Sequence, residues 1–397
     1  MICCYANISF VYYLWGIMKR FKDNIGNIIL LLVSLIICIV STEVLLRIYN
    51  PFEFSVKGDK IILRAYKKNS ILTKYSNFYN NKLDAKIIHT KNSIGFRGDD
   101  PPQNLEKYLS IITVGGSTTE CLLLSDGKDW PAVLNNMLKR DIPLIWTNNA
   151  GIDGHSTYGH AILMEDYITK IKPKMVLFLV GMNDIGLEKI QPFDEKTMIK
   201  KANFVSIKDF IKWVEDNSEI LSFGQNIDRC RRAKARQLSH HQIDVEKLGY
   251  TDLEEKSIVE RKLLNESKFL IPFEKRLENL IRISRKANII PVFITQPVLY
   301  GHGIDPVTGV DLGKIKMADG FSGSLNWKIL ELYNQKTREV GKKNDVLVID
   351  LATKMPKNSA LYYDVMHYTN QGSEVVAKII FNDLIPHIKK NFPQYIQ

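Results

Sequence analysis

The chain has 397 residues, of which 45% are hydrophobic and 24% charged, so it can bury a full core as one large domain or two modest ones, and a disordered chain is excluded. The formal net charge of +11 would suit a nucleic acid, an anionic membrane surface or an acidic polymer, but the excess is lysine scattered among Ile and Asn, so we expect a solvated basic surface and no nucleic-acid partner. No disulfide framework or zinc spacing is visible among the five cysteines, which are Cys3, Cys4, Cys38, Cys121 and Cys230.

An uncharged run of 19 residues covers positions 24–42. As a helix it would be about 28 Å long, enough to cross the hydrocarbon core of a bilayer. Basic residues precede it and apolar residues continue to Leu46, which favours an uncleaved transmembrane anchor at 24–46 over a buried core helix or a cleaved signal peptide. We expect a single-pass protein of the cell membrane, with its short tail inside and its body outside the cytoplasm.

The rest of the chain is divided around this anchor. Met18 opens a charged stretch that leads into it, so the first 17 residues are interpreted as an over-extended start. The stretch after the anchor is basic and weakly periodic, and we interpret it as a juxtamembrane segment packed loosely against the body. The predicted tail, anchor, juxtamembrane segment and body cover residues 1–23, 24–46, 47–108 and 109–397.

Within the body, residues 185–270 carry charge-rich helical patterns and no strong strand. Such a long insertion is either a lid over a site or a mobile surface excursion, and both readings stay open. Its basic stretch at 228–236 is either a solvated helix face or a contact for an anionic polymer or lipid headgroup.

Five short apolar runs have the length and composition of buried parallel strands. They are LSIITV, LIWTNN, MVLFLV, IIPVFIT and DVLVID, at residues 109–114, 144–149, 175–180, 289–295 and 345–350. Helical patterns separate them, one starting at Asp129 as N-cap with Pro131 in its first turn, another ending on Gly341. The alternation predicts an α/β sandwich with a mostly parallel sheet and a ligand site beyond the carboxyl ends of the strands.

The first of these runs ends in "VGGSTTE", where Ser117 follows two glycines. A nucleophilic serine must project from the sheet edge with its N–H free, and glycines before it allow a tight turn. An ordinary turn, or a serine that caps the next helix, would explain the same residues, so the other strand ends have to decide.

Two further strand ends carry groups suited to binding an oxyanion. The second run leads into "NNAGIDGHS", where the N–H of Gly151 could face a substrate without a side chain in the way. The third leads into "VGMNDIG", where the Asn183 amide offers a neutral donor. Turn chemistry alone would explain either feature.

The segment "YYDVMHYTNQG" near the C-terminus places Asp364 three residues before His367. A general base needs an imidazole oriented by a carboxylate, and this spacing lets one loop supply both groups. Thr369 or Asn370 could cap the final helix.

Taken together and in this order, the four segments resemble the four sequence blocks of the SGNH or GDSL-type hydrolase family, over roughly residue 109 to the C-terminus. Gly116 stands where the first block usually has Asp, as in membrane-tethered relatives. The segment "NSIGFRG" at 92–98 also resembles a stretch that precedes the first block in anchored members, and we assign it no chemistry. The matching positions are Gly115, Gly116 and Ser117, then Gly151, then Gly181 and Asn183, then Asp364 and His367.

The resemblance implies a three-layer α/β/α fold with a five-stranded sheet, and acyl-ester chemistry without a metal or organic cofactor. It implies that Ser117 attacks the carbonyl, His367 removes its proton and Asp364 fixes the imidazole tautomer. The N–H groups of Ser117 and Gly151 and the amide of Asn183 would hold the oxyanion.

The sequence therefore predicts a membrane-anchored serine esterase that removes O-acyl groups, such as acetyl, from an extracytoplasmic glycan. An O-acyltransferase using the same residues on a surface polysaccharide is an open alternative, because the chain does not tell whether water or a sugar hydroxyl takes the acyl group. A glycan-binding or assembly protein that has lost turnover is the other alternative.

Overall fold

The computed structural model describes most of the predicted body and the N-terminal helix. Side chains are described from residue 26 onward within that helix. About half of the predicted insertion at 185–270, including the basic stretch at 228–236, lies outside the described residues. The described residues are 3–48, 54–57, 60–63, 71–72, 82–84, 87–190 and 245–396, with 194, 207, 210, 211, 214, 218–221, 223, 224 and 227 between them.

A parallel sheet of five strands forms the centre of the body, in the order β6-β5-β7-β8-β9. Each strand lies in one of the five apolar runs, except that β5 continues one residue further to Gly115, so the predicted sheet is confirmed. Because the strands are parallel, their carboxyl ends meet along one edge. The strands are β5 (Leu109–Gly115), β6 (Ile145–Asn149), β7 (Met175–Val180), β8 (Ile290–Thr295) and β9 (Val348–Ile349).

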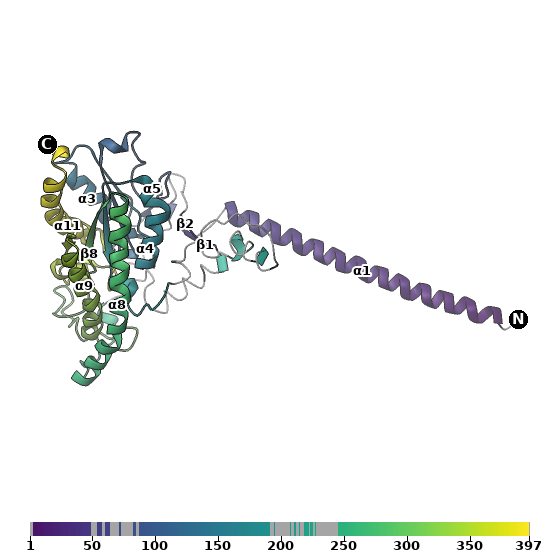
Figure 1. The fold of residues 1–397 in the computed structure, drawn as a ribbon. Helices are drawn as coiled ribbons and strands as arrows, with labels where there is room; N and C mark the ends of the chain where they lie inside the picture. Colours follow the sequence, from purple (N-terminus) through teal and green to yellow (C-terminus); the bar gives the residue numbers. More distant parts are fainter. Residues whose placement is uncertain are drawn as a thin grey trace.

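Helices cover both faces of this sheet. Alternate side chains of β7 enter two separate hydrophobic clusters, one on each face, as a pleated strand requires. One cluster includes residues of α3 (Trp130–Leu138) and α11 (Asn370–Asn391). The other includes residues of α4 (Thr157–Leu163), α8 (Lys256–Lys286) and α9 (Gly323–Lys343). Figure 1 shows α3 and α11 on one side of the sheet and α4 and α8 on the other, which confirms the three-layer sandwich.

Two of the predicted helices form, and one boundary differs. The Asp129 side chain accepts the N–H of Ala132 at the start of α3, as the N-cap prediction requires. Helix α9, however, continues past Gly341 to Lys343. A Cβ on Gly341 would lie 2.1 Å from Cγ2 of Val348, so this glycine permits close packing of the helix on β9 and does not end the helix.

The remaining elements are short, apart from the N-terminal helix. They are α1 (Cys3–Ile48), β1 (Phe54–Lys57), β2 (Lys60–Leu63), β3 (Ile71–Leu72), β4 (Ile87–Ile88), α2 (Ser117–Glu120), α5 (Thr169–Ile171) and α10 (Leu351–Lys354). Single turns lie at Leu105–Lys107, Met164–Ile168, Met182–Asp184, Val245–Lys247, Ser359–Leu361 and Pro393–Tyr395.

Part of the predicted juxtamembrane segment is integral to the body. Ile87, Phe96 and Arg97 are buried, and Arg97 exchanges two backbone hydrogen bonds of 2.9 Å with Asn149 at the end of β6. The expectation of loose packing is therefore wrong for residues 87–98. Their weak periodicity reflects the irregular path that follows the two-residue strand β4, along which buried residues such as Phe96 and Arg97 do not recur at helix or strand spacing.

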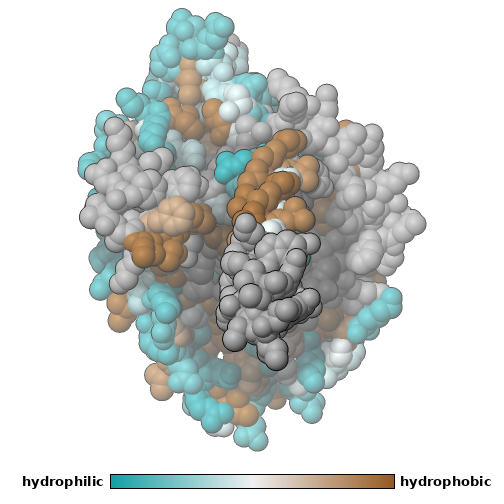
Figure 2. All heavy atoms as spheres, turned by 90° about the vertical axis from the view of Figure 1, so that its right-hand side faces the viewer, coloured by the Kyte–Doolittle hydropathy of each residue, from teal (hydrophilic) through white to brown (hydrophobic). Residues whose placement is uncertain are grey.

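Helix α1 extends away from the body, with its C-terminal end nearest to it (Figure 1). Its segment Gly26–Ile48 is 23 residues long with a mean hydropathy of 2.8, and its apolar side chains are exposed. Figure 2, viewed from the side on which α1 projects, shows these side chains as an apolar ridge. The segment has the length and hydropathy that a membrane span or a signal sequence needs, and it contains most of the predicted anchor.

Candidate active site

Strand β5 delivers Ser117 to the carboxyl edge of the sheet. Gly115 ends the strand, and Ser117 begins the single-turn helix α2. A Cβ on Gly115 would lie 2.1 Å from Oγ1 of Thr119, and one on Gly116 would lie 2.3 Å from Nδ2 of Asn183. Both glycines are therefore needed because the turn brings neighbouring side chains against the backbone.

Ser117, His367 and Asp364 form a continuous hydrogen-bonded chain. The Oγ of Ser117 lies 2.8 Å from Nε2 of His367, and Nδ1 of His367 lies 2.5 Å from Oδ2 of Asp364. The three residues are only 7%, 2% and 2% exposed. Residues separated by 250 positions in the chain thus share one buried site, as the sequence predicts.

The loop that carries the histidine is fixed by its own backbone. Oδ1 of Asp364 accepts the N–H groups of Met366 at 2.8 Å and His367 at 2.6 Å. The ring of Tyr363 stacks on the imidazole with 9° between the planes. The Thr369 side chain caps α11 by accepting the N–H of Gly372 at 3.0 Å, as expected.

These contacts assign the tautomer of His367. An ionised carboxylate only accepts hydrogen bonds, so Nδ1 carries the proton that faces Asp364. Nε2 is then free of hydrogen and accepts the hydroxyl proton of Ser117. This is the arrangement that general-base activation of a serine requires.

Asn183 lies beside Ser117 on the turn after β7. Its Nδ2 donates to the backbone carbonyl of His155 at 2.9 Å, which leaves its second amide hydrogen for another acceptor. Together with Ser117 and Gly116, it lines a small cavity. The predicted oxyanion donor is thus next to the serine.

A buried ion pair supports the Asn183 turn from behind. Oδ1 of Asp184 accepts both the N–H and the hydroxyl of Thr157, at 3.1 and 2.6 Å, and lies 3.2 Å from Arg276. Burial raises the pKa of the Asp184 carboxyl above its usual value, against the effect of Arg276. The pair joins the turn after β7 to α8, and the hydrogen bonds with Thr157 join the same turn to the start of α4.

Gly151 does not occupy the position expected of it. Its N–H donates to Oδ1 of Asn149 at 2.9 Å, and a Cβ there would lie 2.3 Å from the backbone nitrogen of Glu120. Gly151 is also not among the residues that line the cavity at Ser117. Its N–H is already used inside the loop, so the expectation that it contributes to an oxyanion hole is not supported by this geometry.

Gly154, three residues further on, does not line this cavity either, but its N–H is not taken up inside the loop as that of Gly151 is. It is partly exposed and has a positive φ of 75°, and its N–H donates to no other residue in the described part of the chain. It directly precedes His155, whose carbonyl holds Asn183. Both glycines lie in the segment "NNAGIDGHS". The hydrogen bond of the Gly151 N–H is the feature that distinguishes them as oxyanion donors.

Two other histidines lie near the serine without contacting it. His155 and His160 both line the cavity, with their ring centres 6.1 Å apart. Burial lowers the pKa of His160 to about 3, and neither of its ring nitrogens has a hydrogen-bond partner among the described residues. His160 is therefore neutral at physiological pH, and His367 is the imidazole within reach of Ser117.

Several buried polar residues around the site carry no functional signal in the sequence. Arg97 lay in the quoted segment "NSIGFRG" but had no role assigned to it, and Glu120 ended the quoted segment "VGGSTTE". Arg276 sits in a helical pattern rich in charges, where nothing marked it as buried. A charged residue on the apolar face of a helix would be the signal for it, but that face is defined only once the packing is known.

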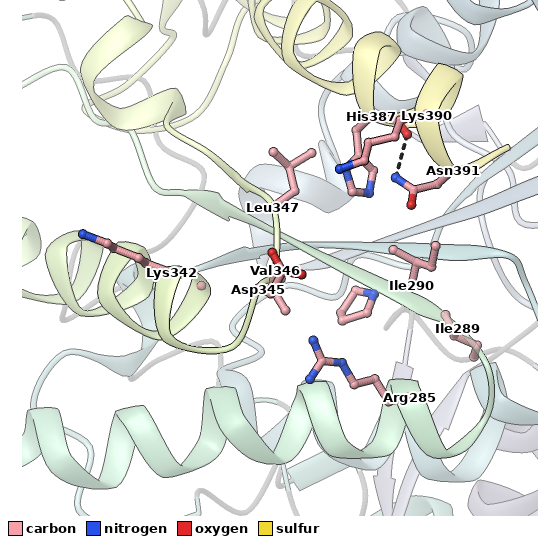
Figure 3. Close-up of a pocket in the computed structure, with 12 residues that line it drawn as sticks. Arg285, Ile289, Ile290, Lys342, Asp345, Val346, Leu347, His387, Lys390 and Asn391 are labelled. Atoms are coloured by element: carbon pink, nitrogen blue, oxygen red, sulfur yellow. Dashed lines mark hydrogen bonds between the residues drawn. The ribbon is translucent and has the colours of Figure 1, made fainter. Parts of the chain in front are cut away.

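A larger cavity of about 560 Å³ opens at the opposite edge of the sheet, at the amino ends of β8 and β9. Figure 3 shows Arg285, Lys342, Lys390 and His387 around it. It holds no serine or cysteine beside a histidine, so the small cavity at Ser117 remains the candidate active site. In the described part of the chain, no three His, Cys, Asp or Glu side chains group as a metal site would require.

The model of the GDSL-like lipase/acylhydrolase family matches residues 112–375, which include every residue of the triad. The chain belongs to this family. GDSL-like proteins of this family hydrolyse ester bonds, so the chain is an ester-bond hydrolase. A search of curated proteins finds no match.

Solved structures resemble the GDSL-like chain in fold. A lipolytic protein of the G-D-S-L family from Desulfitobacterium hafniense is 13% identical, with a TM-score of 0.37 over 69% of this chain and 99% of that one. The acetylxylan esterase Axe2 from Geobacillus stearothermophilus is 14% identical, with a TM-score of 0.39 over 69% of this chain and 93% of that one.

Proposed function

We propose that Ser117 is the nucleophile, His367 the general base and Asp364 the carboxylate that orients it, in an esterase that works through an acyl-serine intermediate. The observation that carries the proposal is the 2.8 Å contact between Ser117 Oγ and His367 Nε2, with Asp364 behind the imidazole. In this geometry the imidazole removes the serine proton as the oxygen attacks.

The reaction proceeds in two balanced steps. Ser117 Oγ adds to the carbonyl carbon and its proton moves to Nε2 of His367. The bond to the alcohol then breaks, and Nε2 returns the proton to the departing oxygen. In the second step water takes the place of the alcohol, with His367 again accepting a proton, and the acid leaves as Ser117 recovers its hydrogen.

We propose that the oxyanion is held by the N–H groups of Ser117 and Gly154 and by the amide of Asn183. Ser117 is the first residue of α2, so its N–H has no acceptor within the helix. Asn183 has a hydrogen left after its contact to His155. Each such donor typically contributes about 3 to 4 kcal/mol to the transition state.

We propose a short acyl group, such as acetyl, as the part of the substrate that enters the site. The cavity lined by Ser117, Asn183 and Met366 has a volume of about 10 Å³, which is the space of a single water molecule. A long acyl chain would have to displace the side chains of residues such as Gln296 and Met366, which are buried.

We propose that the alcohol part is an extracytoplasmic glycan, reached by a body that α1 tethers to the cell membrane. The exposed apolar segment Gly26–Ile48 supports the tether, and a tether is useful when the substrate is a polymer at the cell surface. The net charge of +11 favours a polyanionic glycan. The division into tail, anchor and body remains part of this proposal, with the start of the body moved to about residue 87.

An O-acyltransferase on the same residues is the second candidate. The observation that favours it is the burial of Ser117, which is 7% exposed beside a cavity of about 10 Å³. Limited access for water would lengthen the life of an acyl-serine and allow a sugar hydroxyl to take the acyl group.

The test of the esterase is turnover of p-nitrophenyl acetate by a body lacking residues 1–48, compared with Ser117→Ala. We expect the variant to lose nearly all turnover and labelling by a fluorophosphonate. Equal rates for the two proteins would refute the catalytic proposal and favour a glycan-binding protein. Acetate released from a panel of acetylated polysaccharides then identifies the glycan.

The choice between hydrolysis and transfer is made by product analysis. The same protein is supplied with p-nitrophenyl acetate and an unacetylated oligosaccharide, and acetylated sugar is measured against free acetate. Acetate as the sole product supports the esterase. Acetylated sugar formed faster than acetate supports the transferase.

A further inference from the structure

The helix that carries the candidate nucleophile is too short to hold itself. Helix α2 has a single turn, Ser117–Glu120, and ends where Cys121 adopts a left-handed conformation with φ 52°. A single turn is unstable alone because it fixes several residues for one hydrogen bond. Its position, and with it the direction of Ser117, must therefore come from outside the helix.

Side chains from three other segments bind the carbonyls at its end. The Nε1 of Trp130 donates to the carbonyl of Thr118 at 3.1 Å, and Nδ2 of Asn149 donates to that of Thr119 at 2.7 Å. The carbonyls of Glu120 and Cys121 accept hydrogen bonds from Arg97. These partners take up the acceptors that every helix leaves open at its C-terminus.

Arg97 binds the largest share of this turn. Nη1 donates to the carbonyls of Glu120 and Cys121, both at 2.8 Å, and Nη2 donates to the carbonyl of Leu124 at 2.8 Å and to Asp126 at 3.1 Å. The planar fork of a guanidinium can serve several carbonyls at fixed angles, which a lysine cannot do.

The charge on Arg97 is secured although the side chain is 1% exposed. Burial works against it, but the carboxylates of Asp129 and Asp126 hold the pKa of Arg97 above its usual value. Its backbone is fixed at the same time by the paired hydrogen bonds with Asn149. Both ends of Arg97 are therefore anchored to the sheet edge that presents the site.

Glu120 links the same turn to the loop of the second strand end. Its Oε2 accepts the N–H of Asp153 at 2.6 Å, and its Oε1 lies 3.7 Å from Nζ of the buried Lys91. Glu120 fixes the peptide group that carries the Asp153 N–H. The following peptide group, which carries the N–H of Gly154, is restrained as a result. The segment that supplies Lys91 and Arg97 thus controls both the serine turn and a proposed oxyanion donor.

We propose that Arg97 is a positioning residue for catalysis, and that with Glu120 it holds Ser117 and the Gly154 N–H in the geometry of the reaction. The inference rests on the proposed function. Misplacement of reacting groups by about 1 Å can cost on the order of a hundredfold in rate. Residues 91–98 are therefore a functional part of the body and not a spacer between it and the membrane.

The test compares Arg97→Lys with Arg282→Lys in the full chain. Arg282 is an exposed arginine whose contacts here are to Asn279, away from the site. For Arg97→Lys we expect kcat for p-nitrophenyl acetate to fall at least tenfold with KM changed less than twofold, at a temperature where circular dichroism shows a folded protein. The rate of fluorophosphonate labelling should fall in parallel.

A purely structural role gives a different result. Arg97→Lys would then lower the Tm while kcat of the folded protein equals that of Arg282→Lys, and this outcome overturns the proposal. If Arg97→Lys does not fold, Glu120→Asp replaces it, because the shorter side chain keeps its charge near Lys91 and withdraws from Asp153. Glu254→Asp is its control, since Glu254 accepts a backbone N–H of Ser322 at 2.6 Å elsewhere. Unchanged kcat in Glu120→Asp also overturns the proposal.

Hydrogen exchange separates this inference from the proposed function. We expect the backbone amides of residues 117–124 and of Asp153 to exchange faster in Arg97→Lys and Glu120→Asp than in their controls. Equal exchange contradicts the positioning role whether or not the protein is active. Faster exchange in the two variants, together with a wild-type protein that turns over no esters, would support the role of Arg97 and Glu120 in holding the turn and remove only the esterase.

Discussion

The amide nitrogen of Asn183 donates a hydrogen bond of 2.9 Å to the carbonyl oxygen of His155. The same nitrogen lies against the backbone of Gly116. The carbonyl fixes one amide hydrogen, so the other has a defined direction. A side chain on Gly116 would occupy the space of the amide, since its Cβ would lie 2.3 Å from Nδ2. The glycine that replaces the usual acidic residue of the family is thus coupled to the proposed oxyanion donor.

Gly116→Ala is expected to lower kcat by about 10 to 100-fold, because the new methyl displaces the amide that would stabilise the oxyanion. Kinetics with p-nitrophenyl acetate measure this. Gly249→Ala is the matched control, since the nearest atom to its added Cβ is 3.9 Å away. Similar kcat values for the two variants would contradict the coupling.

Asn183→Ala removes the donor itself. We expect a loss of about 100 to 1000-fold in kcat with KM little changed, as for the loss of one oxyanion donor. Fluorophosphonate labelling should slow by a similar factor, because the phosphonyl oxygen uses the same donors. A variant with wild-type kcat would exclude Asn183 from the transition state.

Asp364→Asn changes the tautomer of His367. The new amide would offer a hydrogen to Nδ1, so the imidazole proton moves to Nε2 and the ring cannot accept the proton of Ser117. The expected loss in kcat is about 10⁴-fold. Oδ1 can still accept the N–H groups of Met366 and His367, so the Tm should change little. A Tm so low that the variant is unfolded at the assay temperature would contradict the tautomer change as the cause of the lost activity.

Stability should fall in acid because His160 is buried as a neutral ring. Its pKa is lowered by burial from 6.5 to about 3. Below pH 6.5 the His160 ring is therefore protonated in the unfolded chain and neutral in the folded chain. As the pH is lowered, the free energy of unfolding falls by up to about 1.4 kcal/mol per pH unit until the pH approaches 3. Urea unfolding at pH 7, 5.5 and 4.5 measures this.

His160→Gln provides the comparison for that slope. The glutamine does not titrate, so its unfolding free energy should depend less on pH between 6 and 4, although its stability at pH 7 is lower. An equally steep pH dependence in this variant would show that another group is responsible.

Removal of residues 1–48 should release the body from membranes. The full chain is expected to stay in the pellet after washing with high salt and with carbonate, because the segment Gly26–Ile48 is apolar over 23 residues. The shortened chain should be found in the supernatant with unchanged esterase turnover. Release of the full chain by salt alone would contradict the anchor.

The main elements of this fold can be predicted from the amino-acid sequence. Five apolar runs of strand length, separated by helical patterns, were enough to predict the parallel sheet, because buried parallel strands are apolar on both faces. Asp129 and Thr369 marked helix starts through local hydrogen bonds that depend on a few neighbouring residues. Ser117, Asn183, Asp364 and His367 stood at strand ends or beside a helix start, and a parallel sheet brings such ends to one edge.

Which polar groups are available for chemistry depends on how distant segments pack against one another. In the sequence, Gly151 and Gly154 are equally suited to donate an N–H to an oxyanion. In the structure, the N–H of Gly151 is already bound to Asn149. Arg97 looked like part of a basic, weakly periodic stretch, and its burial against the end of α2 depends on contacts with residues more than 20 positions away. Periodicity and local capping report what a segment does with its neighbours in sequence, whereas the use of an N–H or a guanidinium depends on distant segments that meet only when the sheet is assembled.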